Sequence, residues 1–83
     1  MTKYKSRSKR LEGAQVKIED AKIEVEELRD ELQEWLDNLP ENLQESSKAE
    51  QLQEAIDSLE EVIDNLDESI SAADGVEFPG MYG

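Results

Sequence analysis

A proline-containing interruption divides this chain into two helical patterns, and it reads Asp37-Asn38-Leu39-Pro40-Glu41-Asn42-Leu43-Gln44-Glu45-Ser46. Pro40 has no backbone N–H and pushes the residue before it out of the helical region, so the sequence predicts two helices rather than one. Ser47 followed three residues later by Glu50 is a capping box, which predicts that the second helix begins there. The interruption therefore predicts a bend between two helices.

The residues before the bend follow a heptad repeat. Apolar side chains alternate at intervals of three and four without a break, at Leu11, Ala14, Ile18, Ala21, Val25, Leu28, Leu32, Trp35 and Leu39. This pattern predicts a helix over about residues 8–38 with one apolar seam, as in coiled coils. Leu11 begins the column of a positions and Ala14 the column of d positions. Trp35 is interpreted as a seam residue rather than as a binding aromatic.

The residues after the bend repeat the pattern, at Ala49, Leu52, Ile56, Leu59, Ile63, Leu66, Ile70 and Ala73. They predict a second helix over about residues 47–73, ended by Gly75 as a left-handed C′ residue. Two helices of matched length joined by a short connection favour an antiparallel hairpin. The expected fold is therefore all-α, a coiled-coil-like hairpin of two helices.

Charged residues beside the seam test the antiparallel register. When Leu28 is placed opposite Ile63, the flanking positions pair Arg29 with Glu60 and Lys22 with Asp67. Both pairs have opposite signs, although acids greatly outnumber bases in the chain. Exposed pairs contribute only a few tenths of a kcal/mol, so they are expected to set register more than stability.

The charge is unevenly distributed along the 83 residues, which hold nine bases and 22 acids. Residues 1–10 carry a net charge of +5 and residues 11–83 a net charge of −18. We therefore divide the chain into a basic arm (1–10), an acidic hairpin (11–73) and a tail (74–83). The acidic body repels nucleic acid and anionic lipid. The arm alone has the charge to contact phosphate, and its alternatives are contact with an acidic body or disorder.

The composition excludes most enzyme chemistry. The chain has no His and no Cys, and its paired acids lie on solvated helix faces without a pocket to raise their pKa. We expect no catalytic site, no metal site and no cofactor. No apolar run exceeds two residues, so we also expect no membrane segment and a cytoplasmic protein.

Apolar residues outside the seam predict a second contact surface, and the alternative is scattered surface side chains. Two hairpins would bury such a surface as a homodimeric four-helix bundle, or another protein would cover it. The residues assigned to self-association are Val16, Ile23, Leu36, Ala55 and Val62.

The tail gathers aromatic and apolar side chains around a Pro79-Gly80 turn. One interpretation is a plug that folds back over Leu11, Ala14 and Ala73. The other is a docking peptide for a protein partner. The tail residues assigned to partner binding are Val76, Phe78, Met81 and Tyr82.

Three segments resemble small acidic helical proteins encoded by bacteriophages. They are Trp35-Leu36-Asp37-Asn38-Leu39-Pro40-Glu41-Asn42-Leu43-Gln44, Lys48-Ala49-Glu50 and Phe78-Pro79-Gly80-Met81-Tyr82. The resemblance implies no activity and no site residue. It implies only a small accessory or inhibitory protein that acts inside an infected bacterium.

Two functions remain open. The first is a non-catalytic helical interaction module that self-associates and docks a protein partner. The second is an acidic nucleic-acid mimic that inhibits a DNA- or RNA-handling host defence protein, since the charge density of a dimer would reach that of duplex DNA. The acidic face of the mimic would be formed by Glu27, Glu31, Glu34, Glu61, Asp64 and Glu68.

Overall fold

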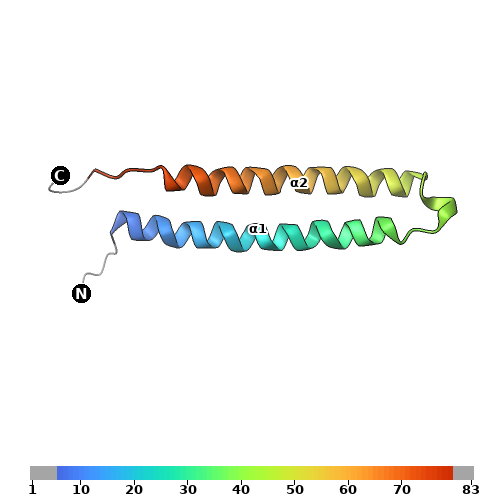
Figure 1. The fold of residues 1–83 in the computed structure, drawn as a ribbon, viewed down its shortest axis with the longest axis horizontal. Coiled ribbons are helices and arrows are strands. Elements are labelled where there is room, and N and C mark those ends of the chain that lie inside the picture. Colours follow the sequence, from blue (N-terminus) through green and yellow to red (C-terminus); the bar gives the residue numbers. More distant parts are fainter. Residues whose placement is uncertain (1–5, 80–83) are drawn as a thin grey trace.

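The computed structural model describes residues 6–79 and consists of two long helices joined by a short bend. Helix α1 spans Arg7–Asp37, a 3-10 turn η1 spans Glu41–Leu43, and helix α2 spans Ser47–Asp74. The two helices lie side by side and antiparallel, with the start of α1 and the end of α2 at the end opposite the bend (Figure 1). The all-α hairpin is confirmed, and each helix boundary lies within one residue of its prediction. Arg7–Arg10 of the predicted arm belong to α1, and residues 1–5 lie outside the described residues.

Serine side chains cap both helix N-termini. The Ser6 hydroxyl accepts a hydrogen bond from the backbone N–H of Lys9 at 3.2 Å, and that of Ser46 accepts one from Ala49 at 3.4 Å. Each bond satisfies one backbone donor that the first turn leaves free. The predicted cap at Ser47 is therefore wrong by one residue.

The C-terminus of α2 also differs from its prediction. Gly75 has φ −89° and ψ −1°, a right-handed conformation, and its N–H donates to the carbonyl oxygen of Ala72 at 3.1 Å. The left-handed C′ glycine was wrong, because the chain leaves α2 through a tight turn of the same hand and continues in an extended tail. Any L-residue can adopt this backbone conformation.

The best-buried apolar cluster lies next to the bend. Leu39, which precedes Pro40, is buried together with Ala49 and Leu52, and Leu32 and Leu36 pack against them. Pro40 begins the turn that carries the chain across to α2, and the N–H of Leu43 closes it on the Pro40 carbonyl oxygen at 2.8 Å. The bend is thus held by packing on the inside and by a hydrogen-bonded turn on the outside.

The seam agrees with the prediction on α2 and differs from it on α1. All eight predicted seam positions of α2 are buried or half-buried. On α1 the column of a positions from Leu11 to Leu39 is buried or half-buried, but the four d positions are exposed, namely Ala14, Ala21, Leu28 and Trp35. Helix α1 is therefore rotated about its axis relative to the predicted seam, and the interpretation of Trp35 as a seam residue is wrong.

Two helices on one seam leave much surface uncovered. Among the described residues, only Leu39 and four side chains of α2 are buried, namely Ala49, Leu52, Ile56 and Ile63. Helix α1 has no fully buried side chain at all. The fold therefore leaves room for a further contact.

Candidate functional site

One long face of the hairpin is marked by ion pairs between the helices. Lys22 Nζ lies 2.9 Å from Asp67 Oδ1, and Arg29 Nη1 lies 4.0 Å from Glu60 Oε2, so both predicted pairs are confirmed. The hydrogen bond from Lys22 to Asp67 raises the pKa of the lysine above its usual 10.5, against a smaller effect of desolvation. We call this side the ion-pair face.

A third polar contact on the ion-pair face was missed by the sequence reasoning. Gln15 Nε2 donates to Asp74 Oδ1 at 2.7 Å and to the backbone oxygen of Ile70 at 3.2 Å. The residue numbers of Gln15 and Asp74 add to 89, as do those of both ion pairs. The sequence signal for this contact is a polar residue directly after the d position, repeated at intervals of seven as Gln15, Lys22 and Arg29. These contacts draw the e positions of α1 toward α2 and account for its rotation.

The same rotation turns two large apolar side chains away from the seam. Leu28 is 46% exposed and Trp35 is 50% exposed. Consecutive residues of an α-helix are rotated by about 100°, and the half-buried a column, which faces α2, lies between Leu28 and its neighbour Arg29. Leu28 and Trp35 therefore lie on the other long face of the hairpin from the ion-pair face.

Lys48 shows which part of α2 shares this side. Its Nζ lies 5.4 Å from the centre of the Trp35 ring, a cation–π contact between the two helices. Ala55 and Val62 follow Lys48 at intervals of seven residues and so lie in the same column of α2. Val62 is 42% exposed. We define the apolar stripe as Leu28 and Trp35 of α1 with Ala55 and Val62 of α2.

The side of α2 that bears the stripe carries no acid. Nine acids lie within Ser47–Asp74, and all of them occupy other columns. Two neighbouring columns beside the seam hold Lys48, Gln51, Ala55, Ser58, Val62, Asn65, Ser69 and Ala72. In a chain this acidic, a continuous acid-free strip along a helix is the pattern of a covered surface rather than of a solvated one.

Charge is also graded along the length of the hairpin. The half at the bend, residues 23–66, holds 15 acids and two bases, a net charge of −13. The half at the open end, residues 6–22 and 67–79, holds seven acids and five bases, a net charge of −2. All four residues of the apolar stripe lie in the acidic half.

The open end brings the start of α1 together with the tail. Phe78 and Val76 line a shallow hollow that Leu11 and Ala73 also line, which is part of the arrangement expected of a plug. Phe78 and Val76 nevertheless remain 39% and 47% exposed. Phe78 also lies beside Arg7 and Arg10. The other two tail residues assigned to partner binding, Met81 and Tyr82, lie outside the described residues.

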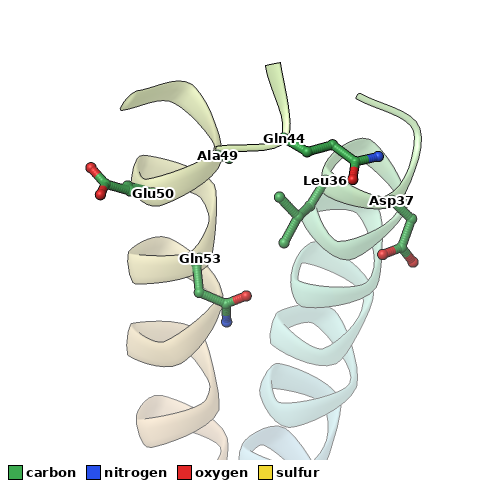
Figure 2. Close-up of a pocket in the computed structure, with 6 residues that line it drawn as sticks. All are labelled: Leu36, Asp37, Gln44, Ala49, Glu50 and Gln53. Carbon is green, nitrogen blue, oxygen red and sulfur yellow. The ribbon is translucent and has the colours of Figure 1, made fainter. Parts of the chain in front are cut away.

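A second hollow lies between the helices beside the bend, on the ion-pair face, with an open volume of about 450 Å³. Figure 2 shows the side chains of Leu36 and Gln53 directed into it, and those of Asp37 and Glu50 directed away. Its interior is an alkyl group and neutral amides, so it offers neither a nucleophile nor a base. Within residues 6–79, no group of three or more acids is arranged to hold a metal ion.

The five residues assigned to self-association do not form one surface. Ala55 and Val62 lie in the apolar stripe, while Leu36 packs against the hairpin's own core. Val16 and Ile23 are more than half exposed. Each directly follows a residue of the ion-pair face, so both lie on the other side of α1 from Leu28.

The acids assigned to one face are divided between the two long edges of the hairpin. Three of these acids lie on the side of α1 that faces away from α2, at Glu27, Glu31 and Glu34. The other three lie on the side of α2 that faces away from α1, at Glu61, Asp64 and Glu68. All six are exposed. They form two acidic edges with the apolar stripe on the face between them.

No protein-family model, curated protein or solved structure matches this chain. Neither α1 nor α2 is apolar enough along its length to cross a membrane. Function is therefore inferred from the surfaces described above, of which the apolar stripe has the most definite chemistry.

Proposed function

We propose that this protein is a non-catalytic helical interaction module that self-associates and docks a protein partner through the apolar stripe. The exposure of Leu28, Trp35 and Val62 on one face, contributed by both helices, carries this proposal. A large aromatic side chain with aliphatic neighbours and a rim of charge is the usual composition of an interface centre. The acid-free strip of α2 supports the same surface.

The experiment uses the full chain immobilised against a bacterial extract, followed by calorimetry with the purified partner. We expect Trp35→Ser to weaken binding at least about 30-fold, since a central interface tryptophan contributes 2 kcal/mol or more. Val16→Ser is the matched control, because Val16 is similarly exposed but lies on the other side of α1. Circular dichroism checks that both variants keep their helices.

Two outcomes would contradict the proposal. One is an equal loss of affinity in both variants, which would mean that the stripe is no more important than any other exposed apolar residue. The other is full affinity in Trp35→Ser, which would move the contact elsewhere. The tail residue Phe78 is tested in parallel, and loss of binding in Phe78→Ala alone would assign docking to the tail.

A second candidate function is mimicry of nucleic acid, and the graded charge favours it. The −13 half is about 30 Å long at 1.5 Å per residue with the bend included, which gives one charge per ~2.3 Å. Duplex DNA carries one per ~1.7 Å. A protein that binds DNA or RNA would then recognise the acidic edges rather than the stripe.

Salt separates the two functions. Binding through the acidic edges should fall steeply as salt rises from about 50 to about 500 mM, and binding through the stripe should change little. Glu27→Gln with Glu61→Gln should weaken a mimic and leave a stripe-bound partner unaffected. From the resemblance alone, we further propose that the protein acts as a bacteriophage accessory or inhibitory protein.

A further inference from the structure

We infer that the occupant of the apolar stripe is a second copy of this chain, stacked on the first with its bend at the opposite end. This inference rests on the proposed function, because it uses the same stripe as the contact surface. It adds that the occupant of the stripe is a second copy of this chain and that the two copies run in opposite directions. Two independent observations on the hairpin lead to it.

The first observation is the order of side-chain sizes along α1. The exposed d column reads Ala14 and Ala21 in the open half, then Leu28 and Trp35 in the half at the bend. When α1 of a second copy runs antiparallel over this column, Leu28 lies over Ala21 of the other copy and Trp35 over Ala14. Each large side chain then meets a small one, which allows close packing.

Helix α2 follows the same order. Val62, which is exposed in the half at the bend, would lie over Ser69 of the second copy, in the acid-free strip. That strip bears only one charged residue, Lys48. The two copies therefore approach through α2 without bringing carboxylates together, and the interface continues across both helices.

The second observation is the graded charge. Stacking with both bends at the same end would place one −13 half on the other. Reversing the second copy places each −13 half on a half with a net charge of only −2, and brings Lys17 of one copy near Glu31 of the other. Charge repulsion across a partly desolvated interface disfavours the first arrangement. The charge distribution therefore selects the antiparallel pair.

The stoichiometry is tested by sedimentation equilibrium of the full chain between about 1 and about 500 µM, a range that spans the dissociation of a dimer with a Kd of about 50 µM. We expect the wild type to dimerise, and more tightly in high salt, because salt screens the repulsion between two acidic chains. Ala21→Glu should remain a monomer, since its carboxylate blocks the place of Leu28. Val16→Glu adds the same charge outside the interface and should still dimerise.

The direction is tested with single cysteines, since the chain has none of its own. Residue 24 lies next to the two-fold axis, so Glu24→Cys should form a disulfide-linked dimer on mild oxidation. In Glu31→Cys the two sulfurs would be about 20 Å apart along the helix and should not cross-link. Cross-linking of Glu31→Cys but not Glu24→Cys would overturn the antiparallel arrangement.

The inference and the proposed function can fail separately. A wild type that stays monomeric at all concentrations would overturn the inference, while loss of a different partner in Trp35→Ser would still support the stripe as a docking site. Equal dimerisation of Ala21→Glu and Val16→Glu would also overturn it. If Trp35→Ser retained both the dimer and the partner, the inference and the proposed function would both be wrong.

Discussion

Replacement of Ile56 by alanine should be among the most destabilising substitutions in the hairpin. Ile56 is 2% exposed, the least of the buried side chains. Removing three carbon atoms loses about 2.4 kcal/mol of transfer free energy at about 0.8 kcal/mol each. The seam is only one side chain thick, so the helices can partly close the cavity and its added cost stays small. We expect the free energy of unfolding to fall by about 2–3 kcal/mol.

Urea unfolding followed by circular dichroism at about 5 µM protein measures this loss on a largely monomeric hairpin. With a slope of about 1 kcal/mol per molar urea, the midpoint should fall by about 2–3 M. A hairpin this small has only about 3–5 kcal/mol of stability, so the variant needs an osmolyte to define its folded baseline.

Val62→Ala is the control for Ile56→Ala, because it shortens an apolar side chain of the same helix that is 42% exposed. Its cost should be below about 0.5 kcal/mol, since little buried surface is lost and alanine favours the helix. Equal midpoints for the two variants would refute the assignment of the seam.

In urea unfolding of dilute protein, Leu32→Ala should lower the free energy of unfolding by about 1–2 kcal/mol more than Leu28→Ala, because of the two leucines only Leu32 packs against the buried cluster. Equal losses would mean that the a and d positions of α1 are buried alike, as the heptad pattern predicted. Gly13→Ala should raise the free energy of unfolding by about 0.5–1 kcal/mol, because the added methyl group meets open space and alanine favours the helix; a lower melting temperature would contradict this. The pKa of Lys22 is raised by its hydrogen bond to Asp67, so the stabilisation from this pair is complete below the usual pKa of 10.5 and is lost as pH rises through the raised value. Melts between about pH 9 and about pH 12 should show this loss in the wild type but not in Lys22→Met, and parallel curves would show that the pair contributes nothing.

The sequence was sufficient to predict the hairpin, and the reasons are local. Pro40 interrupts the helix, and apolar residues repeat at intervals of three and four on both sides of it. The two ion pairs follow from the same antiparallel register, because a heptad pattern fixes which flanking positions meet. Their observation at 2.9 and 4.0 Å shows that charge complementarity was a valid test of topology.

The candidate site was harder to predict, because the heptad pattern of α1 suggests two equivalent columns where only one is used. Alanines at positions 14 and 21 add little to the seam, and Gln15 gains two hydrogen bonds if α1 rotates toward its e column. That balance depends on contacts with α2 and cannot be read from α1 alone. As a result, the sequence reasoning assigned Leu28 and Trp35 to the core and assigned Leu36 to the surface.

The polar contacts on the ion-pair face do not by themselves fix how the two helices are aligned along their length. If α2 moved by one heptad along α1, Lys22 would meet Asp74 and Arg29 would meet Asp67, again with opposite signs; a move the other way would pair Lys22 with Glu60. Electrostatics alone therefore tolerates several alignments. The short bend, fixed by buried Leu39, is what holds the helices in step. A few glycines inserted in the bend would lengthen the connection and allow the two helices to pack in several alignments.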